Sequence, residues 1–563
     1  MNIENIFIEQ AEYLEDDLFN KWNTDHPDEK NIISKLSQNG AKLITGPRGC
    51  GKTTLMLKTY HTLAKKKKTT LGVYVNFKTS LKIEPLYKKN TNASYWFNQW
   101  LMLKIYKGIY ESIMNMGFNM PTDITFSLKQ VDNSINQIEL GLVDAIANIE
   151  MISITQLQSD IHIILDSIDR KHCVLLLDDA AHAFSEEQQR DFFEFFRQIK
   201  NRSISPKAAI YPGITNFSAT FHVGHDAEEI NVWIKPEQKD YYNFMLGILE
   251  KRLPEKVFKK LCENDDFLAI VIYSCFGIPR SLLNTVRSLY KSKMNEEFES
   301  IEVTINKQKV LNAVNLNFQQ TFGIFRSLKV KLPIYRDFII NGENIYYKII
   351  ENIKEYNKNK DIKSQSVTIA IKKPLPPELT KVLGFLQYAG LIMDKNELSK
   401  GEKGVFELYN LHYAALVEKN AFQGKKAINS KDIASALMYR DAHSFKRVVT
   451  NSLLDGRNIL EVFSLSLPPC NVCGQPRISE HSKFCGNCGS QLKSASIFEE
   501  LVSKDIDELP LTEKRVKSIK DHSRIKTIKD LLMDTECREL RGVPQIGPYW
   551  AEKIFSYAEE YIG

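Results

Sequence analysis

Short, continuously apolar runs separate longer helical stretches in the first third of the chain. Three of these runs, residues 41–45, 71–77 and 173–179, have the length of strands. Runs of this kind are typical of strands that helices cover on both faces, as in a parallel sheet. Residues 80–170 instead place large apolar side chains at helical spacing. The pattern predicts an α/β fold with a parallel sheet.

The first run leads into a glycine-rich loop that fits the pattern G-x-x-x-x-G-K-[ST] at every position. The residues expected to bind a nucleotide there are Gly46, Pro47, Arg48, Gly49, Cys50, Gly51, Lys52, Thr53 and Thr54. The glycines let successive backbone N–H groups point at phosphate oxygens, at the positive end of the following helix. Lys52 would contact the β- and γ-phosphates, and the Thr53 hydroxyl would bind Mg²⁺. The motif predicts ATP and Mg²⁺ as cofactors.

The third run ends in two carboxylates, Asp178 and Asp179, which is the arrangement of a Walker B motif. A buried parallel strand would deliver Asp178 to the edge of the sheet where it can hold Mg²⁺. Asp179 could then orient and polarise the attacking water. Together with Lys52, these residues predict a Mg²⁺-dependent ATPase.

Two later segments supply candidates for contact with the γ-phosphate. Residues 208–216 predict a further strand that ends in a polar pair, whose tip would lie between the two Walker motifs. Asn216 is the first candidate there and Thr215 the second, with a plain turn as the alternative. Pro279 suits the first turn of a helix, from which Arg280 could reach the γ-phosphate. A structural helix start with a surface arginine is the alternative.

These motifs, in this order, resemble an AAA+ ATPase of the branch that contains the origin-recognition-complex-like initiators and the STAND ATPases. The resemblance covers roughly residues 30–295. It implies that Asn216 is the sensor 1 residue and Arg280 the sensor 2 residue, and that a helical lid follows the core.

The chain departs from the family pattern in two ways. The family usually ends its Walker B motif in Asp-Glu, whereas this chain has Asp178-Asp179, and a shorter side chain reaches less far. The sequence also has no arginine between Arg202 and Arg252, the region in which many members carry a trans-acting arginine finger. Arg197 and Arg202 are the remaining candidates, and neither is assigned. Such a finger contributes roughly 10³–10⁵ to the rate of related NTPases, so slow turnover and a nucleotide-dependent switch are expected.

Residues 326–425 indicate a winged-helix-like domain. Apolar positions in 378–392 follow helical spacing, the polar stretch 395–403 comes next, and 405–409 are strand-like. Helix, turn, strand, basic tip and strand is the plan of a winged helix, which initiator-like AAA+ proteins commonly carry here. The alternatives are a module that contacts DNA and one that only packs against protein.

Two C-x-x-C-G motifs lie close together near the C-terminus. Their cysteines are Cys470, Cys473, Cys485 and Cys488. Four thiolates complete a tetrahedron around Zn²⁺ and leave no position open for catalysis. The segment resembles a zinc ribbon, with Zn²⁺ in a structural role.

Residues 498–563 resemble a tandem helix-hairpin-helix domain. In the hairpin, Gly547 would let a backbone N–H approach a phosphate and Ala551 would allow close helix packing. Gln545 stands where the usual hairpin has its first glycine. Residues 511–529 carry seven basic side chains against two acidic ones, namely Lys514, Arg515, Lys517, Lys520, Arg524, Lys526 and Lys529 against Glu513 and Asp521. Such a surface suits a phosphate backbone without sequence preference, and protein docking is the alternative.

The whole-chain properties add little to these motifs. A net charge of +6 over 563 residues is weak, so a DNA-binding surface must be local. The chain start has no leader-like pattern, and no window approaches the roughly 20 apolar residues of a membrane span. We therefore expect a cytoplasmic protein without a membrane partner.

The sequence predicts six segments. They are a P-loop AAA+ ATPase core (1–234), a helical lid (235–325), a winged-helix-like domain (326–425), a helical connector (426–467), a zinc ribbon (468–492) and an all-α tandem helix-hairpin-helix domain (498–563). The leading hypothesis is a slowly hydrolysing ATPase that couples its nucleotide state to engagement of double-stranded DNA, and that forms a homo-oligomer. The alternative is a STAND-like signalling or defence scaffold that ATP locks, with a protein partner or effector enzyme supplying the chemistry.

Overall fold

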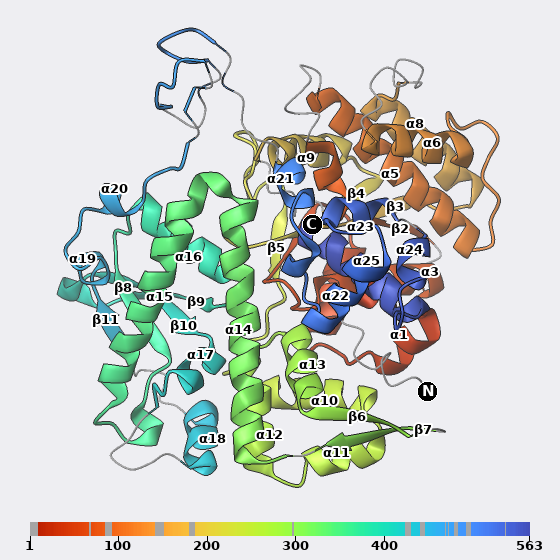
Figure 1. Ribbon diagram of the computed structural model, residues 1–563. Helices are drawn as coiled ribbons and strands as arrows, with labels where there is room; N and C mark the ends of the chain where they lie inside the picture. Colours follow the sequence, from red (N-terminus) through yellow and green to blue (C-terminus); the bar gives the residue numbers. More distant parts are fainter. Residues whose placement is uncertain are drawn as a thin grey trace.

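A five-stranded parallel sheet forms the centre of the N-terminal half of the computed structural model (Figure 1). Its strands are β1 (Lys42–Thr45), β2 (Thr70–Asn76), β3 (His172–Asp178), β4 (Ile204–Ile210) and β5 (Glu228–Asn231). Their order across the sheet is β2-β3-β4-β1-β5, and every neighbouring pair is parallel. The predicted α/β fold with a parallel sheet is confirmed.

The structure describes most of the chain. The described residues are 10–66, 69–84, 93–140, 151–179, 186–295, 298–303, 305–422, 429–439, 445–467, 469–470, 472–477, 482, 484–490, 492, 497–534 and 536–562.

Helices cover both faces of this sheet because its strands are apolar on both sides. Along β3, Val174 and Leu176 pack into one core cluster, whereas Leu175 and Leu177 pack into another. The first cluster contains side chains of α2 (Glu29–Ser37) and α3 (Lys52–Lys66). The second contains side chains of α5 (Ala93–Asn115), α6 (Leu128–Glu139), α8 (Ile154–Ser167) and α9 (Glu186–Ile199). The helical reading of residues 80–170 is therefore correct for the described part.

The strand predicted for residues 208–216 is shifted in the structure. β4 begins at Ile204 and ends at Ile210, and the polar pair lies in the loop beyond it. Pro212 and Gly213 break the strand, since Gly213 has a φ of +75° and proline cannot donate to the ladder. The position of β4 between β1 and β3 matches the expectation that its tip lies between the Walker motifs.

Helices and one hairpin follow the sheet. The helices are α10 (Tyr241–Arg252), α11 (Glu255–Leu261), α12 (Asp265–Ser274) and α13 (Pro279–Ser288). The antiparallel strands β6 (Tyr290–Asn295) and β7 (Phe298–Val303) come next, inside a segment for which the sequence predicted only helices. N-terminal to the sheet lie η2 (Ala11–Tyr13) and α1 (Asp16–Trp22), and η3 (Ser80–Ile83) follows β2.

The long helix α14 (Lys307–Lys331) stands between the first sheet and a second, four-stranded one (Figure 1). The second sheet has the order β11-β8-β10-β9 and is built from β8 (Thr368–Lys372), β9 (Ile392–Ser399), β10 (Val405–Leu411) and β11 (Lys446–Val448). Its helices and short turns are η4 (Pro333–Tyr335), α15 (Arg336–Asn357), η5 (Ile362–Ser364), α16 (Pro377–Tyr388), η6 (Gly401–Lys403), α17 (Tyr413–Glu418), α18 (Ser430–Met438), α19 (Thr450–Leu453) and α20 (Ile459–Val462). The helix, strand, turn and strand predicted here are α16, β9, η6 and β10, while the identity of the unit as a winged helix stays a prediction.

The helix that precedes this hairpin, α16, is packed against the first sheet. A Cβ built on Gly213 would lie 2.1 Å from the carbonyl oxygen of Gly384 in α16. Tyr388, at the end of α16, is buried and meets the Tyr211 ring edge-on at 5.6 Å between centroids. Side chains on this face of α16 are therefore engaged within the chain.

The C-terminal helices form a separate small core. They are α21 (Ile497–Val502), α22 (Glu513–His522), α23 (Ile528–Met533), α24 (Arg538–Arg541) and α25 (Pro548–Ile562), with η7 (Ile506–Glu508) between the first two. The group lies across the first sheet and α3 in Figure 1. Val330 of α14 packs against its core, and the Phe498 N–H donates to the Glu84 carboxylate at 3.3 Å.

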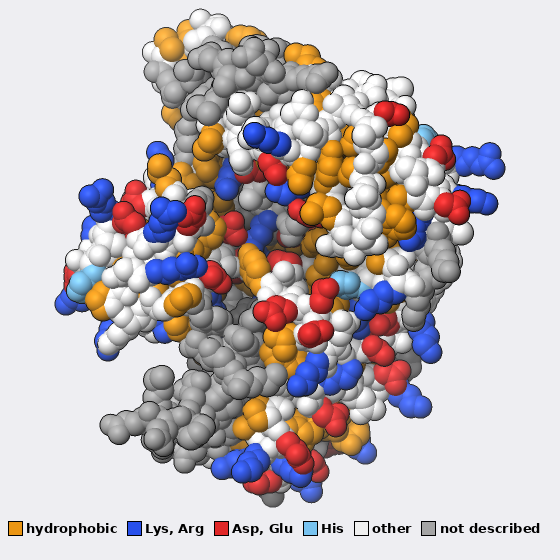
Figure 2. Space-filling model, turned by 90° about the vertical axis from the view of Figure 1, so that its right-hand side faces the viewer, with side chains coloured by type: hydrophobic (Ala, Val, Ile, Leu, Met, Phe, Trp, Pro, Cys, Tyr) orange, Lys and Arg blue, Asp and Glu red, His pale blue; other side chains and the backbone are white. Residues whose placement is uncertain are grey.

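Within the described ranges, none of the helices combines the length and the apolar character needed to cross a bilayer. Figure 2 shows the face on the right-hand side of Figure 1, where acidic and basic side chains are interspersed without a broad field of one sign.

The close contact between Gly213 and Gly384 predicts an unusual response to alanine. Alanine normally stabilises a helix interior by about 1 kcal/mol over glycine. At Gly384 we expect the opposite, because the new Cβ would lie 2.7 Å from the Gly213 Cα, and overpacking of this kind costs about 1–3 kcal/mol. Thermal unfolding of Gly384→Ala should therefore show a lower midpoint than that of the parent chain.

Gly323→Ala is the matched control. Gly323 is an exposed position of α14, and a Cβ there meets no atom within 4 Å. This variant should unfold at an unchanged or higher temperature. Equal behaviour of the two variants would contradict the contact.

Candidate functional site

The P-loop runs from the end of β1 to the start of α3, as the motif predicts. Gly49 and Gly51 have φ values of +82° and +102°, which favour glycine. Space is also limiting at Gly49, because a Cβ there would lie 2.8 Å from the Cβ of Arg280. The Arg280 backbone N–H donates to the Gly49 carbonyl at 3.4 Å. The P-loop and the beginning of α13 are therefore in direct contact.

Lys52 is turned onto its own loop. Its ammonium donates to the Gly46 carbonyl at 2.7 Å and to the Pro47 carbonyl at 3.0 Å. It also lies 3.8 Å from the centroid of the Tyr211 ring. Burial lowers the pKa of Lys52. To reach a β- or γ-phosphate, this ammonium would exchange the loop carbonyls for phosphate oxygens.

The two aspartates at the carboxyl end of β3 have different partners. Asp178 is buried and accepts a hydrogen bond from the Tyr74 hydroxyl at 2.9 Å. Burial, reinforced by the charge of Asp179, raises the pKa of Asp178 to about 7, against a hydrogen bond from Thr53. Asp179 has a φ of +54° and accepts a hydrogen bond from the Tyr211 hydroxyl at 2.9 Å. Thr53 and Asp178, the predicted Mg²⁺ ligands, are therefore adjacent, and their oxygen donors suit that ion.

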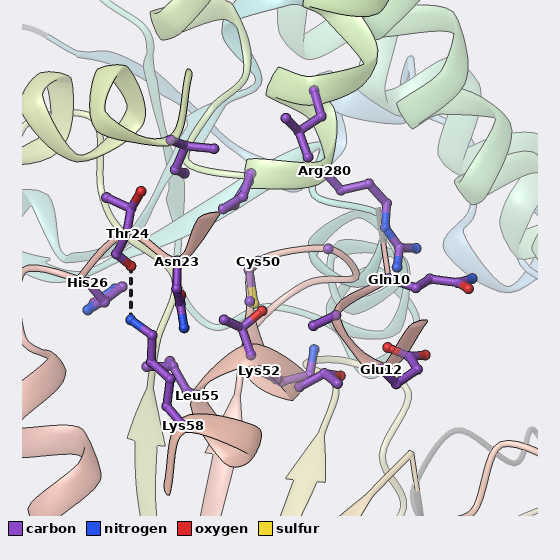
Figure 3. Close-up of a pocket in the computed structure, with 18 of the residues that line it drawn as sticks. Gln10, Glu12, Asn23, Thr24, His26, Cys50, Lys52, Leu55, Lys58 and Arg280 are labelled. Atoms are coloured by element: carbon purple, nitrogen blue, oxygen red, sulfur yellow. Dashed lines mark hydrogen bonds between the residues drawn. The ribbon is translucent and has the colours of Figure 1, made fainter. Parts of the chain in front are cut away.

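These residues surround one pocket with a cavity volume of about 140 Å³. Figure 3 shows Arg280 reaching from α13 towards Gln10, across the P-loop. One part of the lining is apolar and comprises Trp22, Phe244, Ile248 and Leu283. The basic side chains of Arg48, Lys52, Lys78 and Arg280 line it as well, together with Asp179. An apolar wall beside clustered cations suits the base and the phosphates of a nucleotide.

The structure brings Lys52, Thr53, Asp179 and Arg280 to this pocket, but not Asn216. The Asn216 side-chain amide donates to the Ile214 carbonyl at 3.3 Å, and its backbone N–H donates to Gln189. Thr215 bonds to the backbone of Tyr211. The residue that follows β4 and lines the pocket is Tyr211 instead.

Sequence reasoning missed Tyr211 because it followed polarity. The strand ends earlier than predicted, so the first side chain beyond β4 is an aromatic one whose hydroxyl provides the polar contact. The available signal was the pair Pro212-Gly213, which marks the end of a strand. Lys78 and Glu560 were missed as well, since no motif surrounds either of them.

Neither arginine-finger candidate lines the pocket. Arg197 pairs with Glu194 on the same helix at 3.0 Å, and Arg202 is exposed in the loop before β4. A role for either one across a subunit interface stays a prediction.

The four clustered cysteines form the second candidate site. Their sulfur atoms all lie within 4.8 Å of one another. Cys470 and Cys488 are 3.6 Å apart, as are Cys473 and Cys485. Four sulfurs at about 2.3 Å from Zn²⁺ would be separated by slightly less than 4 Å in a tetrahedron. The donor set and its geometry therefore fit Zn²⁺.

The two cysteine motifs have the same local structure. The Gly474 N–H donates to the Cys470 carbonyl at 2.8 Å, and the Gly489 N–H donates to the Cys485 carbonyl at 2.9 Å. Both glycines are left-handed, with φ values of +71° and +66°. The predicted reason for the glycine after each second cysteine is confirmed.

Part of the predicted basic surface on the C-terminal helices is neutralised within the chain. Lys520 pairs with Asp505 at 2.7 Å and with Asp507 at 2.9 Å. Arg515 lies over the Trp550 ring, 3.2 Å from its centroid. The side chains of Lys514, Lys517, Arg524 and Lys529 are exposed. These four residues, called the basic surface below, are what remains for a phosphate backbone.

The hairpin before α25 bears out the concern about Gln545. Its φ is +67°, a conformation that costs a residue with a side chain about 1–2 kcal/mol. The glycine of the usual hairpin would adopt this conformation without strain.

Tyr211→Phe should separate binding from turnover. The ring that covers Lys52 is retained, so we expect ATP affinity to change less than about threefold. Loss of the hydrogen bond to the Asp179 carboxylate should lower kcat about 10-fold, since bonds to charged groups contribute about 1.5–3 kcal/mol. Asn216→Ala serves as the comparison and should lower kcat less. A larger effect of Asn216→Ala on kcat would restore the original assignment.

Cys485→Ser should abolish the binding of zinc. We expect about one equivalent of zinc per chain in the desalted protein, measured by elemental mass spectrometry, and almost none in the variant. Cys262→Ser, which alters a partly exposed cysteine outside the cluster, should keep its zinc. Equal zinc content in the two variants would show that the cluster is not the site.

Comparison with known proteins bears on the first of these sites. Residues 5–171 match the model of the family described as ORC-CDC6-like, which is less than a third of the chain. No curated protein matches.

Solved structures are similar only at low scores. Cdc6p from Pyrobaculum aerophilum is 12% identical with a TM-score of 0.29, and the alignment covers 72% of this chain and 98% of that one. The ORC2 protein of Aeropyrum pernix, in ADPNP–ADP complexes, is 13% identical with a TM-score of 0.25, and the alignment covers 73% and 91%. These scores do not establish a common arrangement of the whole chain. The family match and the P-loop geometry agree, however, and they identify the nucleotide-binding region of this chain as that of an ORC-CDC6-like AAA+ ATPase.

Proposed function

We propose that this protein is a slow, Mg²⁺-dependent ATPase that couples its nucleotide state to the binding of double-stranded DNA. The observation that carries the proposal is the single pocket lined by Lys52, Thr53, Asp179 and Arg280. Asp178 and Thr53 would hold Mg²⁺, Lys52 and Arg280 would bind the phosphates, and Asp179 would orient the attacking water.

Three features favour slow turnover. Lys52 must leave the loop carbonyls of Gly46 and Pro47 before it can reach a phosphate. Asp179 has a shorter reach than the glutamate usual in the family, and it is held by Tyr211. The sequence also lacks an arginine between Arg202 and Arg252. A protein with these properties works better as a switch than as a motor.

The basic surface on the C-terminal helices is the favoured contact for DNA. It carries four exposed cations, whereas one face of α16, the helix before the β9–β10 hairpin, is packed against the first sheet. Contacts to phosphates alone would make binding sensitive to salt and insensitive to sequence. In Figure 1 the cysteine cluster protrudes from the two sheets, where Zn²⁺ would stabilise an extension of the surface.

A scaffold function is the second candidate. The packing of the C-terminal helices against the nucleotide pocket favours it, because a nucleotide could then lock or release an assembly without rapid hydrolysis. In that case a protein partner or an effector enzyme would supply the chemistry, and the homo-oligomer would be the active form.

The decisive measurement is ATP turnover with and without double-stranded DNA at two salt concentrations. We expect DNA to stimulate turnover at low salt and to lose this effect at high salt. Lys52→Ala should eliminate turnover under all conditions. Tight ATP binding with a near-zero rate that DNA does not change would favour the scaffold.

A charge-reversal pair tests the DNA surface. Lys514→Glu with Lys517→Glu should weaken DNA binding at least about 10-fold and reduce its salt dependence, since each phosphate contact contributes close to one unit of the salt slope. Lys129→Glu in α6, an exposed lysine outside the C-terminal helices, is the control and should bind DNA normally. Unchanged binding by the double variant would exclude this surface.

A further inference from the structure

The end of the last helix, α25, lies in the nucleotide pocket. Glu560 lines the pocket together with the P-loop and Asp179. Its carboxylate is 3.5 Å from Nη1 of Arg280, and its carbonyl oxygen accepts a hydrogen bond from Nη2 of Arg48 at 3.5 Å. Gln10, near the start of the chain, donates a hydrogen bond to the same carboxylate. Glu560 therefore joins the lid, the P-loop and the N-terminal segment.

The charge around Glu560 is that of an anion site. Burial alone would raise the pKa of its carboxyl group, yet attraction to Arg280, Arg48 and Lys78 lowers the pKa to about 2. Glu560 is therefore ionised, and it sits among the cations that a triphosphate would need. Only about a fifth of its side chain is exposed, at 22%. A partly buried carboxylate of this kind is stable only while its cations stay with it.

Further contacts hold α25 in this place. Ser556 donates to the Gln10 side chain at 2.9 Å, and Tyr13 donates to Glu559 at 3.4 Å. The packing of Val330 against the C-terminal core adds an apolar contact at α14. The C-terminal region is thus docked along one side of the site rather than touching it at one atom.

The cavity that remains is small. Its volume of about 140 Å³ is below the roughly 300–1,000 Å³ of typical ligand pockets. A triphosphate carries several negative charges, and its γ-phosphate can make the bidentate contact with an arginine that a carboxylate also makes. The two anions would compete for Arg280 and Arg48.

We propose that Glu560 is an internal competitor of the triphosphate, so that α25 closes the nucleotide pocket until ATP displaces it. The proposal rests on the proposed binding of ATP and adds its regulation. Displacement would free the helices that carry the basic surface, whose hairpin lies about 20 Å from Glu560 along α25. By thermodynamic linkage, a ligand that draws α25 away would strengthen ATP binding by the same factor.

The test compares Glu560→Gln with the parent chain for binding of Mg·ATP and of AMP. The amide keeps the shape of the side chain but removes its charge. We expect ATP to bind about 5- to 20-fold more tightly, within the usual range of coupling between sites, and AMP, which lacks the β- and γ-phosphates, to bind equally. Glu559→Gln neutralises a neighbouring carboxylate that contacts Tyr13 instead, so it should change ATP affinity less than about twofold.

Each outcome decides between alternatives. Unchanged or weaker ATP binding by Glu560→Gln, with Lys52→Ala binding none, would overturn the competition and leave the nucleotide site intact. A variant that binds ATP normally but turns it over more slowly would make Glu560 a positioning residue for Arg280. If neither the parent nor the variant bound ATP, the proposed function itself would fail.

Hydrogen exchange on the parent chain gives an independent readout. Added Mg·ATP should speed exchange of the backbone amides in residues 556–562, as α25 leaves the pocket, whereas AMP should not. Slower exchange with ATP would mean that the nucleotide tightens the docked state, contrary to the proposal.

Discussion

The parallel arrangement of β1, β3 and β4 is the constraint from which the rest of the site follows. Parallel strands end at one edge of a sheet, so the P-loop, the Walker B aspartates and Tyr211 must emerge side by side. The register makes this concrete, because Thr45 pairs with Ile210 and Leu177 pairs with Ala208. Each side chain that lines the phosphate end of the pocket is held either by this edge or by an element packed on it.

Glycines determine how closely those other elements approach. Gly49 lets α13 come down onto the P-loop, and Gly213 lets α16 come down onto the loop after β4. In both places a Cβ would collide with the neighbouring element. Movement of the P-loop on nucleotide binding would therefore be felt by Arg280, and movement of the β4 loop would be felt by α16. Close packing without side chains transmits displacement because nothing between the two backbones can give way.

The sequence revealed the parts whose chemistry requires a local motif. The P-loop, the Walker B aspartates and the paired cysteine motifs each occupy a few consecutive residues, and their spacing alone determines what they can bind. Contacts made by single side chains from distant elements were not predictable in this way. Asn216 was favoured as the polar side chain at a strand end, yet the strand stops at Ile210 and places Tyr211 there instead. The β6–β7 hairpin was missed because its strands lie in a segment dominated by helical patterns.

Glu560 is the extreme case, since it meets Arg48 across 512 positions of the chain. In the sequence it is one acidic residue on the polar side of an amphipathic helix, and most such residues face solvent. Only the fold reveals that this helix ends against a P-loop. The consequence is physical: a site built to attract a polyanion also attracts any carboxylate that the chain can bring to it. Unless that carboxylate is removed or repelled, it lowers the apparent affinity for the nucleotide. In this protein the carboxylate belongs to the same helical group as the basic surface, so the cost of its presence can become the coupling between the two ends of the molecule.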